Sequence, residues 1–244
     1  MENKRRIILD VPVDTYKLDE FVSKIEEALS STGVKTIIAV NPEKVMRARK
    51  NLRLLSALRD ADFLIPDGIG IVTALKLLYG VTVSRMPGIM LMEHLLGLAD
   101  GKKYKIFIFG SSREVNRTAS SDILKRYPSL ELAGTQHGYV SNEEYGEVVE
   151  KINLSGADIL FVGLGSPKQE EWIHRYKNVL KVKVCMGIGG SLDVIAGRVP
   201  RASRLFQGLG LEWLYRLMRE PSRFKRQSVL PGFALAVLKE KICS

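Results

Sequence analysis

Short apolar runs alternate with longer segments of helical periodicity along most of this 244-residue chain. The apolar runs predict strands over residues 6–9, 35–40, 63–65, 104–109, 130–134, 159–163 and 182–186. The periodic segments predict helices over residues 18–29, 42–58, 69–79, 88–98, 113–126, 142–153 and 167–176. Several runs are continuously apolar, which is typical of parallel strands covered on both faces. The alternation therefore predicts an α/β fold with a mostly parallel, Rossmann-like sheet flanked by helices.

The alternation stops near residues 197–208, so we expect a Rossmann-like body over residues 1–195 and a helical appendage over residues 196–244. The appendage holds ten Lys and Arg against three Asp and Glu, or +7 of the chain's net +10. Its apolar residues Leu211, Leu214, Tyr215 and Met218 share one helical face. A basic, apolar tail on a nearly neutral body indicates contact with an anionic, apolar surface, such as a membrane or a lipid-linked phosphate.

Other bulk properties narrow the setting. The two cysteines, Cys185 and Cys243, fit neither a disulfide framework nor a metal site, and reduced thiols in the cytosol are the expectation. Only three consecutive apolar residues stand between Arg6 and Asp10, which does not suit a signal peptide. No run reaches the roughly 18 apolar residues of a membrane-spanning helix. We therefore expect a cytoplasmic protein whose membrane contact is peripheral.

Glycine-rich or polar turns follow five of the predicted strands. In a parallel sheet these turns share one edge, where glycine lets backbone N–H groups approach a phosphate. One such turn is weak evidence, but five favour a nucleotide or a nucleotide-sugar. The turns begin at Asn41-Pro42-Glu43, Pro66-Asp67-Gly68, Gly110-Ser111-Ser112, Gly163-Leu164-Gly165 and Gly187-Ile188-Gly189.

Asp67 is the acid best placed for chemistry, because it follows an apolar strand and precedes glycine. It suits a general base, although the spacing alone favours a helix cap. Arg85 precedes a helix and is either a diphosphate clamp or a surface ion pair. Gln169 either contacts a sugar hydroxyl or caps a helix.

Metal ligands are not evident in the sequence. Asp60-Ala61-Asp62 has the D-x-D form that sugar-nucleotide enzymes use for a divalent cation, but it precedes its strand and falls at the opposite edge of the sheet. The histidines His94, His137 and His174 are scattered, without zinc spacing. We therefore expect no metal and no cofactor.

Taken together, these segments resemble the WecG/TagA/CpsF glycosyltransferases (glycosyltransferase family 26) from about residue 5 to the end. The matching stretches are Val40-Asn41-Pro42-Glu43, Ile65-Pro66-Asp67-Gly68-Ile69-Gly70, Arg85-Met86-Pro87-Gly88, Gly110-Ser111, His137-Gly138-Tyr139, Gly163-Leu164-Gly165-Ser166-Pro167-Lys168-Gln169-Glu170-Glu171-Trp172, Gly187-Ile188-Gly189-Gly190-Ser191-Leu192-Asp193, Arg201-Ala202 and Gly210-Leu211-Glu212-Trp213-Leu214-Tyr215-Arg216-Leu217.

The resemblance implies an inverting, metal-independent transferase that moves N-acetylmannosamine from UDP to undecaprenyl-diphosphate-linked N-acetylglucosamine, a step in teichoic acid or related polysaccharide synthesis. It implies Asp67 as the catalytic base. The substrate contacts that it implies are Asn41, Arg85, Gln169, Gly110, Tyr139, Asp193, Arg216, Arg223 and Arg226. One departure is Ala39, where similar teichoic-acid members carry threonine, so another UDP-sugar donor stays open.

Three other functions are compatible with parts of the sequence. A Rossmann oxidoreductase needs G-x-G-x-x-G after its first strand, and Asp10-Val11-Pro12-Val13 argues against it. A nucleic-acid-binding module would use the arginines and aromatic residues of the appendage, but the resemblance speaks against a nucleic acid partner. A homo-oligomer using the stripe that includes Leu214 is compatible with catalysis.

Overall fold

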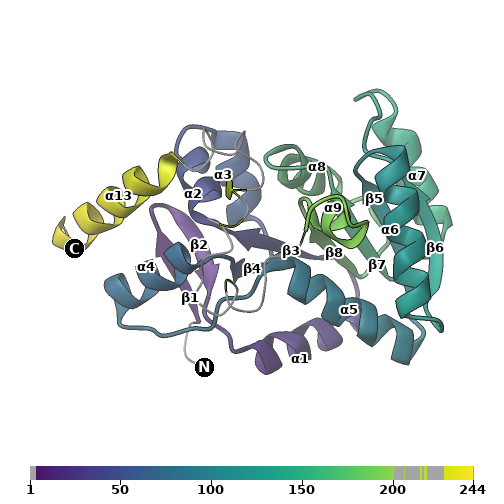
Figure 1. Ribbon diagram of the computed structural model, residues 1–244, viewed down its shortest axis with the longest axis horizontal. Helices are drawn as coiled ribbons and strands as arrows, with labels where there is room; N and C mark the ends of the chain where they lie inside the picture. Colours follow the sequence, from purple (N-terminus) through teal and green to yellow (C-terminus); the bar gives the residue numbers. More distant parts are fainter. Residues whose placement is uncertain (1–3, 201–205, 207–214, 216, 219–227, 244) are drawn as a thin grey trace.

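A computed structural model describes residues 4–200, 206, 215, 217–218 and 228–243 (Figure 1). Its centre is a parallel six-stranded sheet, in which every pair of neighbouring strands runs in the same direction. In spatial order the strands are β4 (Phe63–Pro66), β3 (Lys35–Val40), β8 (Val184–Gly187), β7 (Ile159–Gly163), β5 (Lys105–Gly110) and β6 (Glu131–Gln136). The predicted parallel α/β architecture is confirmed.

Helices cover both faces of the sheet, and successive residues of each strand point to opposite faces. On β3, Ile37 and Ala39 pack toward one face, and Ile38 and Val40 toward the other. The first face is covered by α1 (Leu18–Leu29), α5 (Gly88–Lys102), α6 (Arg113–Arg126) and α9 (Ser191–Ile195). The second is covered by α2 (Pro42–Ala48), α3 (Leu52–Arg59), α4 (Ile69–Tyr79) and α13 (Val229–Cys243) near β3 and β4, and by α7 (Tyr145–Leu154) and α8 (Lys168–Tyr176) near β5 and β7.

The first predicted strand does not join this sheet. β1 (Arg5–Ile8) pairs antiparallel with β2 (Val11–Asp14), a strand that the sequence analysis missed. Leu9 and Asp10 between them have φ of 48° and 71°, the left-handed backbone that a two-residue hairpin turn requires. Leu-Asp is not the usual residue pair for such a turn, so the sequence carried no clear hairpin signal.

The predicted helix over residues 42–58 is two helices. Asn51 begins the second one, because its side chain accepts a hydrogen bond from the Leu54 N–H at 3.1 Å and caps α3. The short helix α9 was also missed.

The end of the chain packs onto the body rather than standing apart from it. Phe233 and Val237 on α13 are 4% and 3% exposed and belong to the core beneath α2 and α4. Figure 1 shows α13 at the end of the molecule away from α6 and α7. The expected apolar helix over residues 211–218 falls mostly outside the described residues. Within the described part of the chain, the helices are too short or too polar to cross a membrane.

Candidate active site

The carboxyl ends of the six strands meet at one edge of the sheet, as the sequence predicted. At the β3–β4 end of this edge, the chain turns through Asn41 into α2 and through Asp67 into α4. The Asp67 N–H donates to the Val40 carbonyl at 2.8 Å, which continues the ladder between the two strands. This bond fixes the backbone of Asp67 directly beside the end of β3.

The proposed capping role for Asp67 is wrong, because Gly68 is the N-cap of α4. Gly68 has φ of 96°, a conformation suited to glycine, and forms no side-chain cap. Asp67 therefore stands one residue before the N-cap and directly follows the last residue of β4. In contrast, the side-chain oxygen of Asn41 does cap α2, accepting from the Lys44 N–H at 2.9 Å.

The segment that carries Arg85 lies against the same strand ends. The Met86 N–H donates to the Pro66 carbonyl at 2.8 Å. Gly88, the first residue of α5, faces Ala39, since a Cβ placed on it would lie 3.5 Å from the Ala39 Cβ. The structure thus brings Asn41, Asp67 and Arg85, which are far apart in sequence, to one corner of the sheet.

A second group of predicted residues lies at the β5–β7 end. The helix after β5 covers one face and the helix after β7 the other, which is the topological switch where α/β sheets bind ligands. Here Gly110 has φ of 144°, and any Cβ on it would lie 2.4 Å from the Gly163 oxygen. Only glycine fits this position. The buried Asn116 side chain fixes the turn by donating to the Gly110 and Gln136 carbonyls.

Tyr139 and Asp193 complete this second group. Tyr139 follows β6 and is 79% exposed, so its ring is available for a ligand. Asp193 lies in the first turn of α9, and its backbone carbonyl accepts from Arg198 and Val199. The carboxyl edge therefore holds one group around Asp67 at the β3–β4 end and another around Gly110 at the β5–β7 end, with the end of β8 between them.

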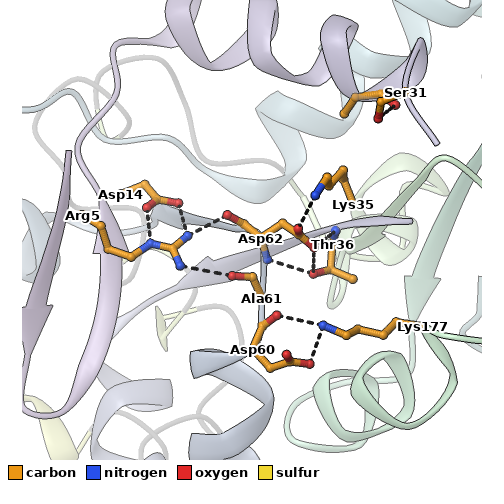
Figure 2. A network of polar contacts seen from close by, with 10 residues as sticks. Arg5, Asp14, Ser31, Lys35, Thr36, Asp60, Ala61, Asp62 and Lys177 are labelled. Atoms are coloured by element: carbon orange, nitrogen blue, oxygen red, sulfur yellow. Dashed lines mark hydrogen bonds and ion pairs between the residues drawn. The ribbon is translucent and has the colours of Figure 1, made fainter. Parts of the chain in front are cut away.

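The predicted D-x-D acids lie at the opposite, amino edge of the sheet, as expected. Figure 2 shows that both contact lysine side chains of the protein. Asp62 accepts from Lys35 at 2.9 Å and from the Thr36 N–H and hydroxyl, both at 3.0 Å. Asp60 pairs with Lys177, and with His174 at 2.9 Å. Burial alone would raise the pKa of Asp62, but its bonds to Thr36 and Lys35 outweigh this and lower it.

Comparison with known proteins decides the family. The model of the family described as "Glycosyl transferase WecG/TagA/CpsF family" matches residues 6–244. The chain belongs to this family. It is 38% identical to the N-acetylglucosaminyldiphosphoundecaprenol N-acetyl-beta-D-mannosaminyltransferase of Bacillus spizizenii, over 93% of this chain and 88% of that protein. Relatives with the same name in Bacillus subtilis strain 168 and Staphylococcus aureus MRSA252 are 36% and 37% identical, over 96% of this chain and 91% and 92% of theirs.

Residues 163–172, the longest of the stretches on which the resemblance was based, contain side chains that are buried inside the protein. Gln169 is 2% exposed, and its Oε1 accepts from the Gly189 N–H at 2.9 Å while its Nε2 donates to Glu170 at 2.8 Å. Its predicted contact with substrate stays a prediction, but the structure gives its amide a role within the protein. Trp172 in the same stretch packs edge-on against Phe109 in the core.

Two residues of this region were missed by the sequence analysis, Lys44 and Glu170. They form an ion pair at 2.8 Å, with exposed fractions of 6% and 0%. Burial alone would raise the pKa of Glu170, but the charge of Lys44 and hydrogen bonds from Lys44 and Gln169 hold it below its ordinary value. Both are charged residues in the first turn of a helix, a position that gives little sign of such burial.

The remaining predicted contacts, Arg216, Arg223 and Arg226, lie outside the described residues. Among the residues that the structure describes, no three His, Cys, Asp or Glu side chains are grouped as metal ligands. The expectation that no metal is required and the role of the tail arginines therefore stay predictions.

Proposed function

We propose that the protein transfers N-acetylmannosamine from UDP to undecaprenyl-diphosphate-linked N-acetylglucosamine, with inversion at the sugar C1. The curated relatives carry the name of this activity and align with nearly the whole chain. The product would enter teichoic acid or a related surface polysaccharide.

The observation that carries the mechanism is the position of Asp67 at the carboxyl edge, beside the Arg85 segment. In an inverting transfer, the acceptor hydroxyl oxygen forms a bond to C1 as the bond from C1 to the UDP oxygen breaks. The hydroxyl proton must go to a base on the acceptor side. Asp67 directly follows β4 at this corner of the site, and it fits that role.

The leaving UDP carries the negative charge, so the site must supply positive charge opposite it. Arg85 comes from the segment bonded to Pro66, and backbone amides at the starts of helices add partial positive charge. We propose that these groups, with Arg216, Arg223 and Arg226, act without a divalent cation. Turnover that is unchanged after exhaustive chelation would support this, and loss restored by Mg²⁺ would contradict it.

Nucleotide recognition is proposed for the second group, around Gly110, Tyr139 and Asp193. The close approach of the Gly110 and Gly163 backbones brings the turns after β5 and β7 together at this end of the edge. The exposed Tyr139 ring suits stacking on a base. The two groups of the site would then hold the two ends of a UDP-sugar.

The acceptor is a lipid, and α13 supports a peripheral position on the inner face of the cytoplasmic membrane. Leu235, Leu238 and Ile242 lie on one helical face and are 68%, 48% and 84% exposed. Lys239 on the same helix adds positive charge. An exposed apolar stripe with lysines is typical of a helix that lies in a membrane interface.

A UDP-release assay with a short-chain lipid-diphosphate-GlcNAc acceptor tests this function. The donors are UDP-N-acetylmannosamine, UDP-N-acetylmannosaminuronic acid and a UDP-hexose, because Ala39 leaves the donor open. We expect the first to be used best. Preference for another donor would correct the donor, and absence of acceptor-dependent release with all of them would refute the function.

A further inference from the structure

A continuous chain of polar contacts crosses the carboxyl edge between the two groups of the site. Lys44 Nζ donates to the Ala39 carbonyl at 2.5 Å and pairs with Glu170 Oε1 at 2.8 Å. The same Glu170 oxygen accepts from Gln169 Nε2, and Gln169 Oε1 accepts from the Gly189 N–H. The chain thus joins the end of β3, the start of α8 and the turn after β8.

The turn at its end is also held by main-chain hydrogen bonds and by the buried Ser191 hydroxyl, which donates to the Ile188 carbonyl at 2.7 Å. Gly189 has φ of 53°, and glycine loses more conformational freedom than other residues when it is fixed. Gly187 has no side chain, and the Gln169 amide nitrogen occupies the space beside it, 2.9 Å from where a Cβ would stand. Gln169 therefore adds the side-chain contact that fixes the Gly189 N–H and fills the space beside Gly187.

A buried ion pair such as Lys44–Glu170 contributes little net stability to a fold. Removing two charges from water is unfavourable, and well-packed apolar residues of similar size often stabilise a fold as well or better. The pair does, however, fix the direction of the Gln169 amide, because Glu170 accepts its N–H and Lys44 holds the carboxylate. This points to a geometric role.

We propose that the Glu170 side-chain oxygen, which Lys44 holds in place, is a positioning group for donor binding: it accepts from Gln169 and orients its amide, which holds the turn over residues 187–190 in the conformation that receives the UDP-sugar. The identity of the donor rests on the proposed function, whereas the coupling from ion pair to turn does not. Lys44 and Glu170 act through Gln169 and are positioning residues.

The test replaces both charges at once, with Lys44→Met and Glu170→Leu in one protein. This avoids an unpaired buried charge, so we expect a Tm within about 3 °C of wild type. The Gln169 N–H loses the oxygen to which it donates, so the KM for the UDP-sugar should rise about tenfold or more. The KM for the lipid-linked acceptor substrate should be unchanged. A purely structural role would lower the amount of active enzyme and leave both KM values unchanged.

A matched variant, Lys44→Met with Glu170→Gln, keeps a hydrogen-bond acceptor at residue 170 but removes both charges. Its amide oxygen still receives the Gln169 N–H, so its donor KM should stay within about threefold of wild type. A second control, Lys102→Gln with Glu26→Gln, removes an ion pair at 3.0 Å between α5 and α1 and should change neither KM.

Hydrogen exchange of the Gly189 amide, measured without substrate, separates the positioning role from the proposed function. It should be about tenfold faster or more in the leucine variant and close to wild type in the glutamine variant. Faster exchange with no transferase activity in the wild type would refute the function and keep the positioning role. A folded leucine variant with wild-type exchange and donor KM would overturn the proposal. If the leucine variant does not fold, a tenfold rise of donor KM in the glutamine variant would overturn it instead.

Discussion

β4 carries an acid at each of its two ends, and the two are held in different ways. Asp62 precedes the strand and is fixed through its side chain by Lys35 and Thr36 (Figure 2). Asp67 follows it, and a backbone bond to Val40 places it beside a left-handed glycine. The first arrangement uses the carboxylate to join two strands, whereas the second uses the main chain to position a carboxylate.

The difference extends to the two edges of the sheet. At the amino edge, charged side chains from distant segments meet: Arg5 bonds Asp14 and the carbonyls of Ala61 and Asp62. At the carboxyl edge, glycine turns and internal amides set the conformation. We infer that the amino edge serves stability and the carboxyl edge serves chemistry, and the following changes test that division.

The largest effect is expected for Asp67→Asn. Loss of the base should lower kcat by about 10²–10⁴-fold, with the Tm nearly unchanged because the backbone bond to Val40 remains. UDP release and thermal unfolding measure the two properties. The matched change Asp62→Asn should leave kcat near wild type, and equal losses in the two variants would break the comparison.

Arg5→Met should be the most destabilising change at the amino edge. It removes the cation beside Asp14, which is 3% exposed, and an unpaired buried carboxylate costs about 4 kcal/mol. Urea unfolding measures the loss. Arg59→Met, which breaks an exposed pair with Asp10, is the control and should cost less than about 1 kcal/mol. Similar losses in both variants would show that the Arg5 network contributes no more to the free energy of unfolding than an exposed ion pair.

Phe233→Ala tests how far the tail supports the carboxyl edge. The ring is 4% exposed and lies near Gly70 in the first turn of α4, beside Pro42 of α2. Its removal should lower the free energy of unfolding by about 3 kcal/mol. Leu235→Ala, on the exposed side of the same helix, should be nearly neutral. A neutral Phe233→Ala would mean that α13 is not part of the folded body.

The smallest effect is expected for the contribution of Asp62 to stability and for its dependence on pH. The folded-state pKa of Asp62 lies below its ordinary value, so its contribution is complete above the unfolded pKa of about 3.9 and is lost as pH falls through the lower folded pKa. Asp62→Asn should cost about 1–2 kcal/mol at pH 7. The difference from wild type should shrink as the pH falls below about 4. A difference that is constant down to pH 2 would contradict this.

The sequence allowed the parallel sheet, its five turns and Asp67 to be predicted, because these depend on local apolar runs and glycines. It did not reveal the hairpin, since nothing in Leu9-Asp10 requires left-handed backbone. Nor did it show which side chain of Lys168-Gln169-Glu170 points inward. The partner of Glu170 is Lys44, on a helix that follows another strand, and the two meet because β3 and β7 end at the same edge of the sheet.

The outer side of β4 has a further consequence. The bond from Asp67 to Val40 shows that odd-numbered residues of this strand direct their backbone groups to β3, so Leu64 and Pro66 direct theirs outward. Asp14 accepts the Leu64 N–H at 2.7 Å, proline has no N–H, and Met86 occupies the Pro66 carbonyl. An apolar edge strand normally invites pairing with another molecule. Along β4, this edge has no outward N–H donor left for a neighbouring strand. Two copies of the protein, even when concentrated at a membrane, would therefore not pair their sheets along β4.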